Sequence, residues 1–251
     1  MKANKPFKDP DFPHDYRGIH PDERKDDFKW KRARDIVANA STFGKNVDPN
    51  GIVQGDLGDC YFLAACSAIA ERDERIKNIF VPEVWSYPKE GIYAFKVFIR
   101  GEPTVVTIDD YLPTKGKGKD MKLIYERQAA DGGIWGPLLE KVWAKTNGYY
   151  KRIEGGQAND VFDFLVGAPS RRFENKGRTV DEVFDLISEA DKADYIITCG
   201  THGEGDHNQI NSYNLPKSHA YSIINAYTLK VKSGKVAHRL FMIRNPYGVF
   251  F

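Results

Sequence analysis

The 251-residue sequence contains 41% hydrophobic and 13% aromatic residues, enough for one sizeable globular unit or for two lobes that share a cleft, and too many for a disordered chain. Its 37 basic and 35 acidic side chains leave a net charge of +2, which argues against nucleic acid or an anionic membrane as the main partner. The longest apolar run, 60–70, is far shorter than the roughly 18 residues of a membrane-spanning helix. Three cysteines without a Cys-x-x-Cys pair, and no apolar signal segment, predict a reducing, cytoplasmic location.

Residues 1–27 form a charged, proline-containing N-terminal arm. Four prolines between positions 6 and 21 disfavour helices and sheets in this segment. Two interpretations are open: an arm solvated along its length, or a segment that wraps the protein surface through Phe7, Phe12 and Trp30.

Mainly helical signals follow over 28–168, which we interpret as a first lobe. Asp59 precedes the apolar run 60–71 (CYFLAACSAIAE), which predicts a buried helix with Asp59 as its N-cap. A short helix is predicted over 73–80, and two strands over 92–100 and 104–109. Pro137 is well placed to open another helix, whose buried face contains Leu138, Leu139, Val142 and Trp143.

The pattern changes after about residue 168, and we interpret 169–251 as a second lobe. An amphipathic helix is predicted over about 179–190, followed by strands over 195–199, 219–231 and 238–245, with a polar loop between the first two strands. A helical first lobe and an antiparallel β second lobe indicate an α+β fold in which the lobes meet at a cleft.

The segment 54–60 (QGDLGDC) carries the strongest indication of chemistry. Its two glycines predict a turn that approaches a ligand closely and leads straight into the buried helix, whose first residue is Cys60. The unpaired N–H groups and the helix dipole favour a nucleophilic thiolate there. Gln54 stands upstream, where its amide can stabilise an oxyanion. A free cysteine is otherwise a packing residue, and we assign that role to Cys66 and Cys199.

A thiolate nucleophile needs a base and a group that orients the base. His219 opens one predicted strand, and Asn245 ends another immediately before Pro246. Adjacent antiparallel strands can present these two side chains together, with the amide holding the imidazole in its useful tautomer. A histidine considered alone is more often a structural or surface residue.

These motifs, in this order, resemble the protease core of calpains, which are papain-like cysteine proteases. The resemblance rests on QGDLGDC at 54–60, HAYS at 219–222 and RNPYG at 244–248. It continues through FKDPDFP at 7–13, KWKR at 29–32, DDYLP at 109–113, LLEK at 138–141 and the Asn-Gly pair at 147–148, and therefore covers nearly the whole chain from residue 7. The arm is then better interpreted as a wrap or a linker into the core.

The resemblance implies a papain-like two-lobe fold and hydrolysis of internal peptide bonds in polypeptide substrates through a thioester on Cys60. It implies His219 as general base and later acid, and Asn245 as its orienter. Gln54 and the backbone N–H of Cys60 would form the oxyanion hole. It also suggests partners in the cytoskeleton or additional C-terminal domains.

The sequence departs from the family at several positions around this site. Tyr61 and Tyr247 replace tryptophans that usually follow the nucleophile and the Asn-Pro pair. Ser218 replaces the glycine before the histidine, and Gly167-Ala168 replaces a Gly-Gly pair. We assign Gly167 and Ser218 to substrate binding. The side chains of Ser218 and Ala168 stand where the family has glycine, and we expect them to crowd a bound peptide and so to slow catalysis or narrow the range of substrates.

Calpain cores are commonly activated by calcium bound to each lobe, and here the first-lobe ligands look lost. Lys151 and Gly51 stand where the resemblance places acids, and Asp48 is three residues away from the second position. The second site would lie mostly past Phe251, and the chain ends before the Trp-rich stretch that completes the second lobe in the family. We therefore expect no metal ligand in the first lobe, no cofactor required by the sequence, and a second lobe truncated at its C-terminus within a longer polypeptide.

Three other motifs support weaker expectations. Lys115–Lys119 alternates lysine with glycine and predicts a solvated hairpin tip, because the strand–helix context of a phosphate-binding loop is missing. Asp109 and Asp110 follow a strand and are predicted to be surface caps. A faint metal-ligand spacing is formed by Cys199, His202, Asp206 and His207.

Two functions therefore remain. The first is an intracellular calpain-like cysteine endopeptidase, which the complete set of nucleophile, base, orienter and Gln54 favours. The second is a catalytically weak or inactive calpain-like scaffold or cytoskeletal module, which the departures at Ser218, Ala168 and Tyr247 favour.

Overall fold

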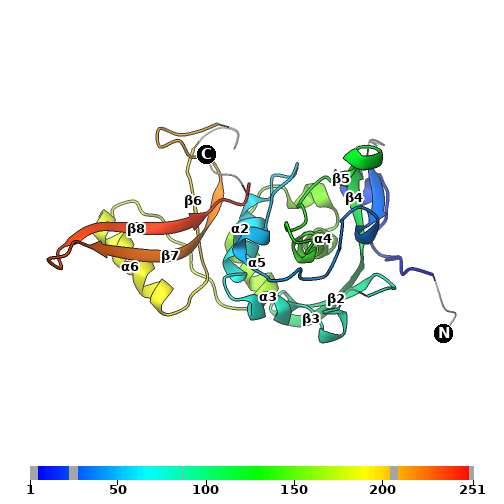
Figure 1. Ribbon diagram of the computed structural model, residues 1–251, viewed down its shortest axis with the longest axis horizontal. Coiled ribbons are helices and arrows are strands. Elements are labelled where there is room, and N and C mark those ends of the chain that lie inside the picture. Colours follow the sequence, from blue (N-terminus) through cyan, green and yellow to red (C-terminus); the bar gives the residue numbers. More distant parts are fainter. Residues whose placement is uncertain (1–4, 23–27, 87, 204–208, 249–251) are drawn as a thin grey trace.

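The computed structural model describes residues 5–22, 28–86, 88–203 and 209–248, and it combines helices with antiparallel sheets. Figure 1 shows that helices α2 (Cys60–Ile69), α4 (Trp135–Asn147) and α5 (Ala158–Val166) gather in one lobe, while a long hairpin with α6 (Val180–Lys192) beside it projects as the other. The α+β fold class is confirmed. Among the described residues, no helix combines the length and apolar character needed to cross a bilayer.

The core of the first lobe is built around α2. This helix contains no charged residue, and side chains such as Phe62, Leu63 and Ile69 are completely buried on all of its sides. Helix α4 packs beside it and begins at Trp135 rather than at the predicted Pro137. The short helix α3 (Asp73–Ile79) lies at the predicted place.

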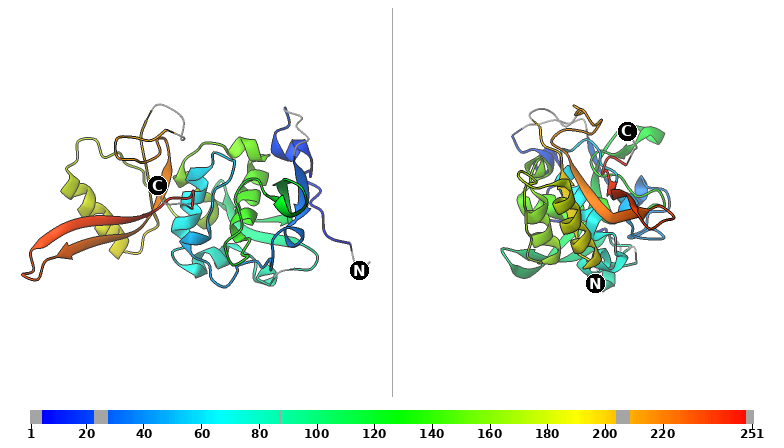
Figure 2. Two further views of the ribbon diagram at one scale, coloured as in Figure 1. Left: turned by 45° about the horizontal axis from the view of Figure 1, so that its top comes forward. Right: turned by 90° about the vertical axis from the view of Figure 1, so that its left-hand side faces the viewer.

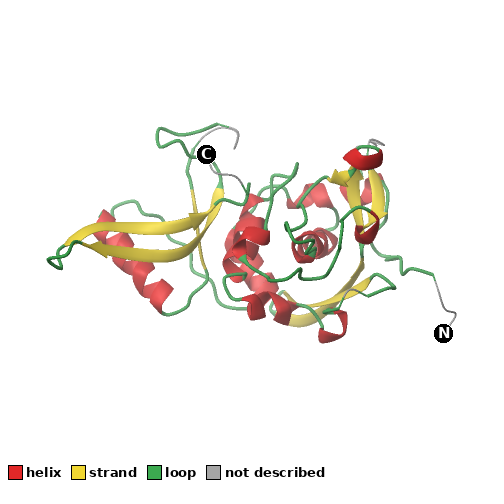
Figure 3. Cartoon of the chain, viewed as in Figure 1, coloured by secondary structure: helices red, strands yellow, loops and turns green. Residues whose placement is uncertain are grey.

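Two antiparallel sheets complete the first lobe, drawn as yellow arrows in Figure 3. Strands β2 (Ile92–Ile99) and β3 (Glu102–Asp109) lie where the sequence predicts strands, although β3 begins two residues earlier, and they pair along their full length. The sheet β1–β4–β5 was not predicted, because its strands are short and Pro113 interrupts the usual strand pattern. It consists of β1 (Lys29–Arg32), β4 (Tyr111–Lys115) and β5 (Lys122–Leu123). The remaining short elements are α1 (Tyr16–Ile19) and 3-10 turns at Ala33–Asp35, Pro49–Gly51, Pro82–Val84, Gly118–Asp120 and Tyr150–Ile153.

The second lobe is a three-stranded antiparallel sheet, ordered β6–β7–β8, with α6 against it (Figure 2). Its strands are β6 (Ile197–Gly200), β7 (Ala220–Lys230) and β8 (Val236–Arg244). A capping box between Thr179 and Glu182 starts α6. Phe184 of α6 stacks on Phe241 of β8 with ring centroids 5.2 Å apart, which attaches the helix to one face of the hairpin.

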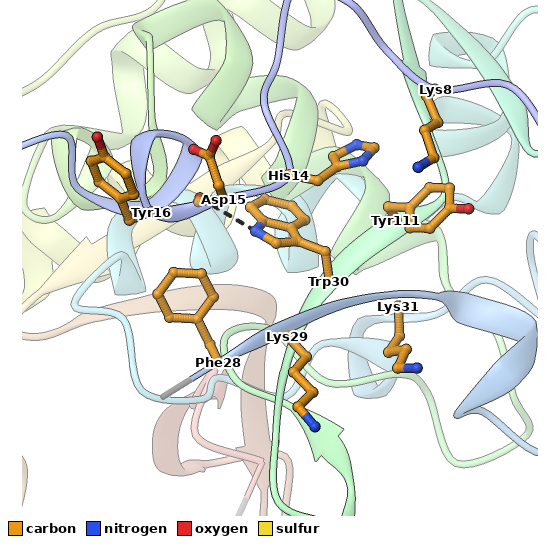
Figure 4. Close-up of a pocket in the computed structure, with 9 residues that line it drawn as sticks. All are labelled: Lys8, His14, Asp15, Tyr16, Phe28, Lys29, Trp30, Lys31 and Tyr111. Carbon is orange, nitrogen blue, oxygen red and sulfur yellow. Dashed lines mark hydrogen bonds between the residues drawn. The ribbon is translucent and has the colours of Figure 1, made fainter. Parts of the chain in front are cut away.

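The described part of the N-terminal arm wraps the end of the first lobe that lies away from the hairpin (Figure 1). Phe12 is 1% exposed and packs against Trp30 and Tyr150. Figure 4 shows the indole of Trp30 reaching under the arm, where its N–H donates to the carbonyl of Asp15 at 3.3 Å. A cavity of about 460 Å³ remains beside this contact.

The prediction that Asp109 and Asp110 are surface caps is wrong, since both are completely buried. Asp109 accepts a hydrogen bond from Lys141 Nζ at 2.6 Å and lies 2.8 Å from His14 Nε2, while Asp110 pairs with Arg32 at 2.8 Å. Burial raises the pKa of Asp109, but the bond from His14 and the charge of Lys141 outweigh burial and hold the pKa well below its usual range. The arm covers Asp109, which also accepts the backbone N–H of Asp9 at 2.5 Å, so Asp109 anchors the arm instead of facing solvent. Asp110 is held by Arg32 of β1.

Candidate active site

The turn at 54–59 delivers Cys60 to the N-terminus of α2. Gly55 packs so closely on the backbone of Ile124 and Tyr125 that a Cβ atom would lie 1.9 Å from the Tyr125 carbonyl oxygen. Asp59 is the N-cap residue as predicted, but only its backbone caps the helix, through its carbonyl and the N–H of Phe62 at 2.8 Å. The Asp59 side chain is buried instead, beside Glu140 of α4.

Cys60 is partly buried, and its thiol lies beside the backbone N–H of Ala220 in the second lobe. Burial raises the pKa of the Cys60 thiol above its ordinary value. The N–H groups of Ala220, Tyr61 and Cys60 itself oppose this shift, whereas the neighbouring Asp59 adds to it. The helix terminus therefore acts in the predicted direction, but burial outweighs it, and the thiol needs a base to lose its proton.

His219 and Asn245 lie side by side at the ends of adjacent strands. His219 precedes β7, Asn245 follows β8, and the imidazole Nε2 is 2.8 Å from Asn245 Oδ1. The same Oδ1 accepts the N–H of Tyr247 at 3.0 Å, which identifies it as the acceptor. Nε2 of His219 therefore carries the proton, and Nδ1 is the basic nitrogen. The Tyr247 ring covers the imidazole, with ring centroids 4.2 Å apart.

Thr201, which the sequence analysis did not single out, holds the backbone of His219. The Thr201 N–H donates to the His219 carbonyl at 2.9 Å, and the Thr201 hydroxyl oxygen accepts the His219 N–H at 3.1 Å. That hydroxyl donates to the carbonyl of Pro216 at 2.5 Å. No local pattern marks this threonine, because its role depends on a loop that returns to the sheet.

Gln54 lines the same cleft as Cys60 and His219. Its side-chain nitrogen donates one hydrogen to the carbonyl of Leu57 at 2.7 Å, and its backbone N–H donates to the carbonyl of Pro246 at 2.8 Å. The amide is therefore held in a fixed orientation within the turn. Its nitrogen has a second hydrogen, which suits the role of oxyanion donor.

The cleft between the lobes has a volume of about 1870 Å³ and is lined by residues of both. Ser218 borders it in a left-handed conformation with φ of 48°, and its hydroxyl donates to the carbonyl of Gly203 at 2.7 Å. Gly167 ends α5, also with positive φ, and packs on the Phe98 ring, while the next residue, Ala168, lines the cleft.

Tyr61 and Cys199 border the cleft, whereas Cys66 lies inside α2. Tyr61 donates its hydroxyl to the carbonyl of Ile153 at 3.0 Å and accepts from the indole of Trp143 at 3.0 Å, so its ring is fixed beside the nucleophile. Cys66 is buried, as a packing residue should be. The same prediction is wrong for Cys199, which is exposed at the end of β6 and lines the cleft.

The residues at the expected first-lobe calcium positions make other contacts. The Lys151 ammonium forms an ion pair with Glu154, so a cation occupies the region where an acidic ligand was expected. Gly51 lies against the ring of Trp135, and Asp48 accepts the N–H of Asn50 at 2.7 Å. Within the described ranges, no group of three or more His, Cys, Asp or Glu residues could hold a metal ion. Of the faint metal motif, Asp206 and His207 lie outside the described residues.

Comparisons with known proteins agree with this geometry. A family model described as "Calpain family cysteine protease" matches residues 7–250. The chain is 31% identical over 258 residues to the calpain-2 catalytic subunit of Homo sapiens, which covers 99% of this chain and 36% of that protein. It is 29% identical over 268 residues to the calpain-type cysteine protease ADL1 of Oryza sativa subsp. japonica, covering 98% of this chain and 12% of that protein. The chain thus spans about a third or less of the length of these relatives.

Proposed function

Because the chain belongs to the calpain family of cysteine proteases, we propose that it is a calpain-like cysteine endopeptidase that cleaves polypeptides in the cytoplasm. The observation that supports this most directly is the His219–Asn245 hydrogen bond of 2.8 Å in the cleft that also contains Cys60 and Gln54. A histidine that only fills space in the core does not need a fixed ring orientation, so the bond that orients the His219 imidazole supports a catalytic role.

In this proposal Nδ1 of His219 takes the proton from the Cys60 thiol, and the sulfur attacks the carbonyl carbon of a bound peptide. The negative charge that develops on the carbonyl oxygen is stabilised by the Gln54 amide and the backbone N–H of Cys60. The C–N bond then breaks, and His219 returns the proton to the leaving amine. Water, deprotonated by His219, hydrolyses the remaining thioester and restores the thiol.

The second candidate is a weak or inactive calpain-like scaffold, with cytoskeletal proteins among its partners. Two observations support it: the strained Ser218 directly before the base, and the burial that raises the pKa of the nucleophile. Neither removes a group on which the chemistry depends, so we favour the endopeptidase.

Labelling with an irreversible, thiol-directed peptidyl epoxide tests the choice. We expect one adduct on Cys60, mapped by mass spectrometry, and none in Cys60→Ala. The exposed Cys199 is the internal control, because it does not stand at a helix N-terminus as Cys60 does, and it should stay unlabelled. If Cys60 reacts no faster than Cys199, the endopeptidase proposal fails and the scaffold becomes the better assignment.

A further inference from the structure

A guanidinium group from the second lobe contacts the segment that leads into the nucleophile. Arg244 is the last residue of β8 and immediately precedes Asn245. Its Nε donates to Asn50 Oδ1 at 3.1 Å, and one Nη donates to the carbonyl of Ile52 at 3.0 Å. The other Nη donates to the carbonyl of Asn245. One side chain thus joins the first lobe to the residue that orients His219.

The acceptors of Arg244 belong to a well-supported part of the first lobe. Asn50 is the middle residue of the 3-10 turn Pro49–Gly51, and Ile52 follows the turn directly. The side chain of Asp48 caps the start of the turn by accepting the Asn50 N–H. The hydroxyl of Ser67, on α2, donates to the carbonyl of Pro49 at 3.2 Å. The turn is therefore attached to the same helix that carries Cys60, and a displacement of the turn would be felt at the nucleophile.

Two more hydrogen bonds connect the lobes near this contact. The N–H of Gln54 donates to the carbonyl of Pro246 at 2.8 Å, and the hydroxyl of Ser222 on β7 donates to the carbonyl of Ala64 on α2 at 2.8 Å. A single bond of this kind fixes a distance. The planar fork of Arg244 also fixes a direction, because its donors point to two acceptors at once.

We propose that Arg244 is a positioning residue that locks the two lobes in their catalytic arrangement by binding Asn50 and Ile52. The hydrogen bonds from Arg244 to Asn50 and Ile52 thereby keep the His219–Asn245 pair in the same cleft as Cys60. Its effect on peptide hydrolysis rests on the proposed endopeptidase function, whereas its effect on the lobe contact does not.

Hydrogen–deuterium exchange of the full chain separates these two effects. In Arg244→Gln we expect the backbone N–H of Gln54, which bonds across the lobes, to exchange about tenfold faster, since hydrogen bonds to a charged group are lost. The kcat for a peptide substrate should fall by a similar factor with a smaller change in KM, because alignment and not binding is impaired. Asn50→Ala, in an exposed turn, should show the same changes to a lesser degree.

Arg239→Gln is the matched control. Arg239 lies on the same strand, but its guanidinium pairs with Asp181 and Asp185 and lies over the ring of Phe184, all of α6 within the second lobe. We expect wild-type exchange at Gln54 and wild-type kcat in this variant. If it slows catalysis and accelerates Gln54 exchange as strongly as Arg244→Gln, the specific role of Arg244 is contradicted.

The remaining outcomes are also decisive. Unchanged Gln54 exchange in both Arg244→Gln and Asn50→Ala overturns the proposal, even if activity falls. Accelerated exchange in a chain whose wild type cleaves no peptide supports the lobe contact and contradicts the endopeptidase. If the β2–β3 amides also exchange faster in Arg244→Gln, that variant has unfolded. The exchange of Gln54 in Asn50→Ala then decides alone whether the proposal is supported or overturned.

Discussion

Ser218 combines a strained backbone with a stabilising hydrogen bond directly before the proposed base. Its φ of 48° lies in the left-handed region, which costs a non-glycine residue about 1–2 kcal/mol. Its hydroxyl bond to Gly203 recovers about 0.5–1.5 kcal/mol and ties His219 to the start of the loop after β6. The replacement of the family's glycine by serine is thus partly compensated within the same residue.

The two contributions at Ser218 can be separated by two substitutions. Ser218→Ala keeps the strain and loses the bond, so we expect the free energy of unfolding to fall by about 1 kcal/mol. Ser218→Gly loses the bond but relieves the strain, and should be about 1 kcal/mol more stable than Ser218→Ala. Urea denaturation followed by tryptophan fluorescence measures both. Equal stability of the two variants would show that the left-handed conformation carries no strain.

At the scale of elements, the start of α2 places its N-cap residue, Asp59, in the core directly before the nucleophile Cys60. Asp59 is buried next to Glu140 of α4, and Glu126 is buried in the same region. Burial raises the pKa of Asp59 to about 7 and raises the pKa of both glutamates as well. The folded protein therefore holds protons that the unfolded chain releases.

This arrangement predicts that stability decreases as pH rises. Between about pH 4 and pH 7 the folded state binds the Asp59 proton and the unfolded state does not, so the free energy of unfolding should fall by about 1.4 kcal/mol per pH unit. Glu126 and Glu140 act in the same direction. Asp109 acts in the opposite direction, but its contribution is lost only below about pH 4. Urea unfolding at pH 5, 6 and 7 measures the slope, and Asp59→Asn should reduce it. A wild-type stability that is constant or rises over this range contradicts the prediction.

The same elements show how far the sequence could predict the structure. The uninterrupted apolar run gives α2, and the β2–β3 pair follows from its strand pattern, because both signals are local. The pairing of His219 with Asn245 is also indicated by local patterns, since His219 opens one predicted strand and Asn245 ends another. The burial of Asp109, the Thr201 bonds and the Arg244 contact could not be predicted, because each depends on a segment distant in sequence.

At the scale of the whole molecule, the first lobe is held at both ends, by the arm on one side and by the second lobe on the other (Figure 1). The arm is fastened to the far side of the first lobe by Phe12, by the Asp9–Lys145 ion pair at 2.7 Å and by the His14–Asp109 contact. The second lobe is joined to α2 and to the preceding turn by Ser222, Pro246 and Arg244. The lobes thus contact each other directly through groups of the chain itself.

We propose that calcium does not stabilise the first lobe and that the reactivity of Cys60 does not require calcium. The Lys151–Glu154 ion pair places an ammonium group where an oxygen ligand would be required, and the positive charge of that ammonium disfavours a divalent cation beside it. We expect the thermal unfolding midpoint of the full chain to be the same in calcium as in an equal concentration of magnesium, and epoxide labelling of Cys60 to persist in a chelator. Calcium present at 100 times its dissociation constant would stabilise the fold by about 2.7 kcal/mol, a shift that is easily measured. A calcium-specific rise in the midpoint that is lost when Glu154 is replaced by glutamine would place a site in this lobe and contradict the prediction.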